Sequence, residues 1–108
     1  MTAVDLELDH LIYGAIRNKQ LIRFTYKSNE RVVEPHDYGV QNGIVGLFRW
    51  QVGGKSGSRI PGWRMIDVEG MQNCELLDKH FAGNREVQGK HHRWDEVFIR
   101  VAPPEKLE

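Results

Sequence analysis

The sequence contains a single cysteine, Cys74, and lacks any long uninterrupted run of apolar residues. One cysteine excludes an intramolecular disulfide and fits a reducing cytoplasm. The missing apolar run excludes a membrane-spanning helix. The acidic start "MTAVDLELDH" lacks the basic and apolar blocks of a signal peptide. We therefore expect a cytoplasmic protein that makes no contact with a membrane.

The chain also lacks net charge, because its 15 basic residues are balanced by 15 acidic ones. Strong non-specific nucleic-acid binding needs a broad basic surface, so this balance argues against it. The charges are nevertheless spread unevenly. Residues 38–66 include no Asp or Glu, whereas Arg49, Lys55, Arg59 and Arg64 all fall there. This positive window leaves room for a local anion site.

The length of 108 residues suits one small domain with one core, so residues 1–108 are treated as a single domain. Apolar side chains at helical spacing predict a helix over about residues 7–18, with Asp5 flanking its start. From residue 20 the apolar period falls to about two, as in strands. Asn42-Gly43 predicts a hairpin turn, and Pro35 predicts an edge or a bend.

The C-terminal part forms an extension over about residues 72–102. Within it, "CELLDKHFAG" predicts a short helix that ends at Gly83, and "VFIRVA" predicts a strand. One helix followed by short strands with glycine bends indicates a mainly β fold. We expect a small, strongly curved antiparallel barrel over about residues 20–70, with the helix packed on it.

Residues 11–71 resemble the WYL domain, a bacterial regulatory module with a small Sm-like or SH3-like barrel. The resemblance is carried by "AIRNKQLIRFTY", "RVVEPHDYGVQNG", "GLFRWQV" and "PGWRMIDV", in which Arg31, Glu34 and Pro35 match the family's recurring Arg and Pro. The chain departs from the family at the Trp-Tyr-Leu triplet, where "IVGL" stands. The family's Arg-rich strand is reduced to Trp63 and Arg64.

This resemblance implies a ligand-sensing module linked to transcription regulation. Family members are thought to hold negatively charged ligands, including nucleotides or single-stranded nucleic acid, on barrel arginines. The matching candidates in this sequence are Arg31, Arg49, Arg59 and Arg64. A divergent stand-alone member of the family would therefore bind an anionic small molecule or a single nucleic-acid strand.

Strand alternation supports an anion site independently of the resemblance. If the loop "GGKSGS" closes a hairpin symmetrically, Arg49 lies opposite Gly62 and becomes a diagonal neighbour of Arg64. Two adjacent guanidinium groups repel each other unless an anion or an acidic side chain bridges them. Arg favours phosphate or carboxylate, and Lys55 adds attraction. The alternative is a solvated strand face whose arginines pair with acidic residues elsewhere.

Trp50 and Trp63 lie inside the positive window and allow two interpretations. Exposed aromatic residues between basic ones form a platform on which bases stack. Buried ones form the core of a small barrel. Alternation places Trp50 on the apolar face together with Phe48, which favours the core. Trp63 follows Pro-Gly and fits either role, so it stays a candidate ligand-binding residue.

No residue pattern indicates catalysis or metal binding. His80, His91 and His92 lack the further ligands that a metal set requires. Cys74 is better explained as a small buried side chain than as a nucleophile. We therefore expect a binding module without enzymatic activity, metal or cofactor. The competing function is a protein-interaction module that forms a homodimer, or binds a partner protein, through an exposed strand edge.

Overall fold

The computed structural model describes residues 5–54, 62–85 and 93–105. It begins with helix α1 (Leu6–Asn18), which matches the helix expected over residues 7–18. The Asp5 side chain accepts a hydrogen bond from the Glu7 amide and caps the first turn. Lys19 takes the left-handed conformation (φ 55°) and ends the helix.

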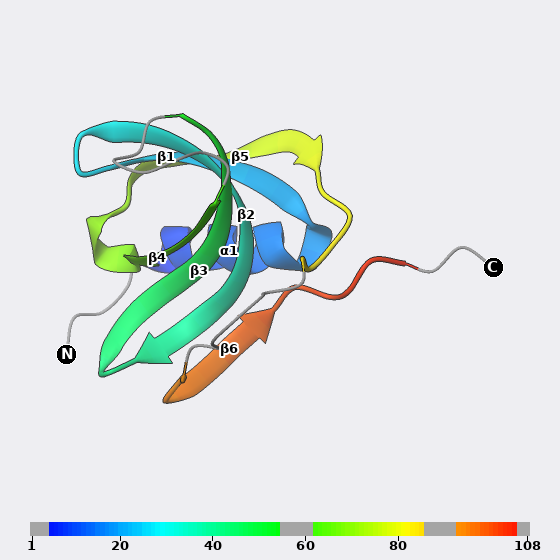
Figure 1. Cartoon of the computed structure of the whole chain (residues 1–108). Coiled ribbons are helices and arrows are strands. Elements are labelled where there is room, and N and C mark those ends of the chain that lie inside the picture. The colour runs from blue at the N-terminus through cyan, green and yellow to red at the C-terminus, as the bar shows by residue number, and fades with distance from the viewer. Residues whose placement is uncertain (1–4, 55–61, 86–92, 106–108) are drawn as a thin grey trace.

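Six antiparallel strands follow the helix. They are β1 (Gln20–Tyr26), β2 (Asn29–Gln41), β3 (Ile44–Gly54), β4 (Gly62–Asp67), β5 (Gln72–His80) and β6 (Glu96–Arg100), with a short 3-10 helix η1 (Val68–Gly70) before β5. The sheet order is β4-β3-β2-β1-β5, and β6 pairs with the C-terminal half of β2 (Figure 1). The mainly β fold with an N-terminal helix is confirmed. The described strands form an open sheet.

Three local predictions can be compared with these strands. Asn42 and Gly43 have positive φ angles (51° and 77°) and close the β2–β3 hairpin as expected. Pro35 marks a bend, because the β2–β3 register shifts between Pro35 and Asp37 and leaves His36 as the extra residue of a bulge. The short helix expected in "CELLDKHFAG" is wrong, since this segment forms β5 through pairing with β1.

The hydrophobic core lies between α1 and one face of the curved sheet, which we call the inner face. The helix contacts β1, β2 and β5 (Figure 1). It contributes Ile12, Ala15 and Ile16, which are almost completely buried. The sheet contributes the other core side chains, which are Ile22, Phe24, Val33, Tyr38, Leu47 and Ile66, together with Val68, Met71 and Val101 around them.

The opposite face of β2, β3 and β4, which we call the outer face, carries an aromatic cluster. The Trp63 ring stacks on Phe48 with a centroid distance of 4.7 Å, and Trp50 meets Trp63 edge-on at 5.2 Å. His36 packs against Trp63 at 4.8 Å and stacks on Phe81 at 5.6 Å. Residues 81–85 therefore cover part of the outer face, and both faces of the central strands bury side chains.

Candidate anion site

Three of the predicted arginines, Arg31, Arg49 and Arg64, come together on the inner face. Arg49 lies directly opposite Arg64 on β4 and opposite Pro35 on β2. The predicted register, with Arg49 opposite Gly62, is wrong, because the β3–β4 pairing is offset by two residues from the expected one. Gly62 instead pairs with Gln51. The shift of two residues keeps both arginines on one face and makes them direct cross-strand neighbours.

Arg49 is fully buried, with 0% of its surface exposed. Its guanidinium lies over the Phe24 ring, 5.6 Å from the centroid. Nη1 donates a 2.9 Å hydrogen bond to Gln51 Oε1, and Gln51 Nε2 donates to the Gly53 carbonyl at 3.2 Å. This chain of bonds fixes the orientation of the guanidinium, so Arg49 is not part of a solvated strand face.

The other two nitrogens of Arg49, Nε and Nη2, are buried and have no hydrogen-bond partner within the described part of the chain. These two nitrogens form one edge of the planar guanidinium, and that edge is the one that binds two oxygens of a carboxylate or phosphate side by side. A buried donor without an acceptor is costly, and each such group in a folded protein needs an explanation.

Arg31 and Arg64 add positive charge beside Arg49. Arg31 is 7% exposed, lies 5.3 Å from the Tyr26 ring centroid and reaches the Tyr26 carbonyl through two long 3.4 Å contacts. Arg64 is partly exposed and donates to the Trp63 carbonyl at 2.6 Å. Burial lowers the pKa of Arg49 to about 9, and the charges of Arg31 and Arg64 contribute to this shift. Arg49 is therefore still charged at neutral pH.

Three acidic side chains on β2 and β5 are paired with arginines outside this group. Glu34 is buried on the outer face, where both of its carboxylate oxygens accept bonds from Arg85 at 2.7 and 3.0 Å. Glu75 pairs with Arg23, and Asp37 lies 3.8 Å from Arg100. We call Arg31, Arg49 and Arg64 the arginine cluster. Two of its members, Arg31 and Arg49, are buried, and Arg64 is partly exposed.

The remaining predicted site residues are not part of this cluster. Trp63 and Arg64 are neighbours on β4, so their side chains point to opposite faces of the sheet. Trp63 lies in the aromatic cluster of the outer face, and the structure does not bring it together with the arginines. Trp50 is half-buried beside it, under the Arg85 guanidinium at 4.9 Å. Lys55 and Arg59 lie outside the described residues.

Gln51 was not among the predicted site residues, although it orients Arg49. The sequence does contain a pattern that could have identified Gln51. Leu47, Arg49 and Gln51 occupy every second position of β3, so their side chains share one face. His36 was also not predicted. Its Nδ1 hydrogen-bonds the Glu34 carbonyl at 2.9 Å, and its Nε2 accepts from the Arg85 amide at 3.1 Å.

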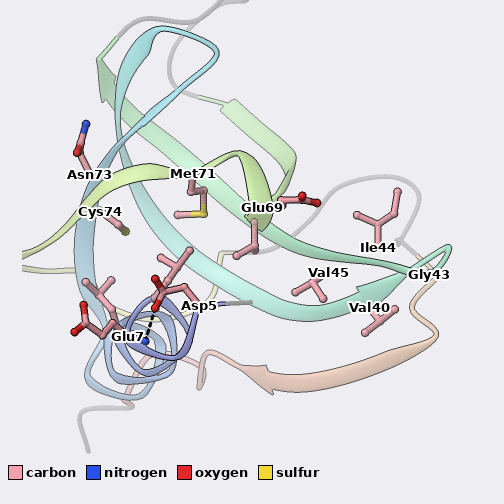
Figure 2. Close-up of a pocket in the computed structure, with 13 residues that line it drawn as sticks. Asp5, Glu7, Val40, Gly43, Ile44, Val45, Glu69, Met71, Asn73 and Cys74 are labelled. Atoms are coloured by element: carbon pink, nitrogen blue, oxygen red, sulfur yellow. Dashed lines mark hydrogen bonds between the residues drawn. The ribbon is translucent and has the colours of Figure 1, made fainter. Parts of the chain in front are cut away.

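A pocket of about 590 Å³ lies at the other end of β2, between the start of α1, the β2–β3 hairpin tip and η1 (Figure 2). Its walls are mostly apolar, and the charged side chains that line it, Asp5, Glu7 and Glu69, are all acidic. Cys74 also lines this pocket, and burial raises the pKa of its thiol to about 11. The pocket does not suit an anion, and the thiol is protonated at neutral pH.

No family model, curated protein or solved structure matches this chain. Within the described residues, no three His, Cys, Asp or Glu side chains gather as metal ligands would. The same residues include no helix with the length and apolar character needed to cross a bilayer.

Proposed function

We propose that this domain is a ligand-sensing module that binds a phosphate-bearing anion, such as a nucleotide or single-stranded nucleic acid, at Arg31, Arg49 and Arg64. The observation that carries the proposal is the buried edge of Arg49, whose Nε and Nη2 donors lack acceptors in the described chain. An oxyanion would supply two acceptors and compensate the charge at the same time. Binding without catalysis requires no reactive group in addition to these three arginines.

The resemblance of residues 11–71 to WYL domains supports a regulatory role linked to transcription. It also supports an Sm-like or SH3-like barrel as the complete form of the sheet. In such a barrel β4 and β5, which end the strand order, would approach each other. The proposal requires no cofactor and no metal.

A thermal-shift screen of nucleotides, followed by anisotropy titrations with short labelled single-stranded RNA and DNA, tests this function. Arg64→Ala should weaken binding of any hit by about tenfold or more, because a charge-assisted hydrogen bond contributes roughly 1.5–3 kcal/mol. Arg17→Ala, which removes the same charge from an exposed position on α1, is the matched control. Equal loss in both variants, or no binding of any phosphate compound below millimolar concentration, would reject the proposal.

A second candidate function is self-association or binding of a partner protein through a strand edge. Among the described strands, β5 pairs with β1 alone, and its Leu76 side chain is 43% exposed. An open edge of this kind can accept another strand. Light scattering over a range of protein concentrations tests it: association should depend on concentration and disappear in Leu76→Lys. A monomer at all concentrations would count against this candidate.

A further inference from the structure

We infer that the ligand presents a terminal phosphate group to the arginine cluster, as in a phosphomonoester or pyrophosphate, and not a phosphodiester within a chain. The inference rests on the proposed function and specifies which part of the ligand enters. It follows from three independent features, which are the burial of Arg49, the excess of positive charge and the fixed direction of the free guanidinium edge.

Burial limits the shape of the group that can reach Arg49. The side chain is 0% exposed, and its free Nε and Nη2 are shielded from solvent. Arg64 is the more exposed member of the cluster, so a ligand reaches Arg49 from the side of Arg64. A diester phosphate has carbon substituents on two oxygens, and both chains must leave the site. A terminal phosphate has one substituent and can enter with its free oxygens first.

Charge selects a dianion over a monoanion. Arg31 and Arg49 are 7% and 0% exposed, and their charges act on each other, so two guanidinium groups are buried in the same region. Uncompensated charges in a protein interior are costly. A carboxylate or a phosphodiester carries one negative charge, which offsets one of these guanidinium groups. A phosphomonoester carries close to two above its second pKa of about 6, and the terminal phosphate of a pyrophosphate carries a similar charge.

The direction of the free edge is set before the ligand arrives. Gln51 holds Nη1 of Arg49 and is itself held by the Gly53 carbonyl, so Nε and Nη2 point in a defined direction. This edge takes two oxygens of the phosphate, and the third free oxygen remains for a further donor. Such preorganisation lowers the ordering cost of binding.

The test compares small ligands that differ in one feature, measured by calorimetry at constant ionic strength in a phosphate-free buffer. The probes are inorganic phosphate, pyrophosphate, methyl phosphate, dimethyl phosphate and acetate. We expect methyl phosphate to bind at least about tenfold more tightly than dimethyl phosphate or acetate, because it carries one more charge and one fewer substituent. Its affinity should also fall several-fold from pH 7.5 to pH 5, where it becomes a monoanion.

A pair of oligonucleotides gives the same comparison in a larger ligand. A short single strand with a 5′-phosphate should bind at least about tenfold more tightly than the same strand with a 5′-hydroxyl. Arg49→Lys keeps the charge but removes the two-nitrogen edge, and it should reduce this discrimination. Arg17→Ala is the control that should preserve it.

The outcomes separate the inference from the proposed function. The inference is wrong, and the anion site stands, if dimethyl phosphate binds as well as methyl phosphate and the 5′-hydroxyl strand binds as well as the 5′-phosphate strand. If acetate binds as well as methyl phosphate, the site does not select phosphate, and both the inference and the phosphate ligand of the proposed function are wrong. If none of these anions binds, both fail. The comparison uses the unmodified protein, so it does not depend on any variant folding.

Discussion

Arg49 costs the fold stability unless a ligand is bound. Its side chain is fully buried, and two of its donors have no acceptor in the described chain. An unsatisfied buried donor costs about 1–3 kcal/mol, and burial of a charge adds to that cost. Functional sites often carry such local penalties, which a purely structural residue at the same position would avoid. The proposed binding role would account for this penalty.

Replacing Arg49 with an apolar side chain should consequently stabilise the free protein. We expect Arg49→Met to raise the free energy of unfolding by about 1–4 kcal/mol, the range seen when buried ionic groups are replaced by apolar ones. Urea unfolding in phosphate-free buffer measures this. Arg23→Met, at an exposed arginine on β1 that pairs with Glu75, should leave the value close to that of the parent, because exposed ion pairs contribute little. A marked loss of stability in Arg49→Met would show that the guanidinium is a structural group.

His36 gives the molecule a predictable dependence on pH. Burial lowers the pKa of His36, and the charge of Arg85 acts in the same direction against the opposing effects of Glu34 and Asp37. Nδ1 donates to the Glu34 carbonyl, so Nε2 must be unprotonated to accept the Arg85 amide. Protonation at Nε2 would place two donors against each other and loosen residues 81–85.

Because the folded pKa lies below the ordinary value of 6.5, the unfolded state binds this proton at higher pH than the folded state does. The stabilising contribution is therefore complete above pH 6.5 and is lost as the pH falls towards the folded pKa. It amounts to about 1.4 kcal/mol for each unit of difference. Urea unfolding at pH 7.5 and pH 5 should show this loss in the parent and in the exposed-site control His10→Gln. If His36→Gln loses the same unfolding free energy between pH 7.5 and pH 5, His36 is not the group responsible for this pH dependence.

Strand alternation correctly grouped Arg49 with Arg64, but it could not assign the buried face. A period of two shows which residues share a face, and burial then decides which face is inside. Phe48 and Trp50 are more apolar than Arg49 and Gln51, so the sequence favoured their side as the core. Phe48 is buried as expected, but Trp50 is only half-buried, and Arg49 and Gln51 are buried on the opposite side. In the structure both faces are covered, one by α1 and the other in part by residues 81–85. This long-range covering is not visible in the local pattern.

At the scale of elements, the pairing of β2 with the end of β3 positions Arg31. Gly54 lies opposite Arg31 and has a φ of 85°. A Cβ atom at Gly54 would lie 2.2 Å from the Glu30 carbonyl oxygen, so the backbone beside Arg31 would have to move. Gly53, its neighbour, has no such conflict, because a Cβ atom there would meet Val32 at 3.5 Å.

Gly54→Ala should therefore destabilise the domain and weaken anion binding together. The left-handed conformation alone costs a residue with a side chain about 1–2 kcal/mol, and the displaced strand adds to this. Gly53→Ala is the matched control and should stay within about 1 kcal/mol of the parent. Urea unfolding and a methyl phosphate titration measure both effects. If Gly54→Ala behaves like Gly53→Ala, β2 is not held by this contact.

The segment forming β5 shows why element type was harder to predict than the β class. Cys74 and Leu77 are the half-buried positions of this strand and lie three residues apart, which imitates helical spacing. The pairing of β5 with β1 is irregular between Gln20 and Ile22 and again between Arg23 and Thr25. These irregularities remove the alternation by which a strand is recognised. Pairing with β1 then overrides the local preference.

At the scale of the whole molecule, the neutral chain separates its charges along β2. Arg31 lies near the start of this strand, in the arginine cluster. Val40, near its end, lines the pocket shown in Figure 2, whose charged side chains are all acidic. The acid-free window of residues 38–66 predicted a positive region, and the structure buries part of that region where the sequence indicated an exposed face. The arginine cluster and the acidic side chains that line the pocket therefore lie at opposite ends of β2.

The most direct test of the anion site is the side-chain Nε–H signal of Arg49 in a ¹H–¹⁵N NMR titration with methyl phosphate. The signal is assigned by its absence from Arg49→Lys. A bound phosphate should shift this signal in a saturable way and slow its exchange with solvent, while the Arg17 signal stays in place. If the Arg49 signal is unchanged at methyl phosphate concentrations that raise the unfolding temperature, the ligand binds elsewhere and the arginine cluster is not the site.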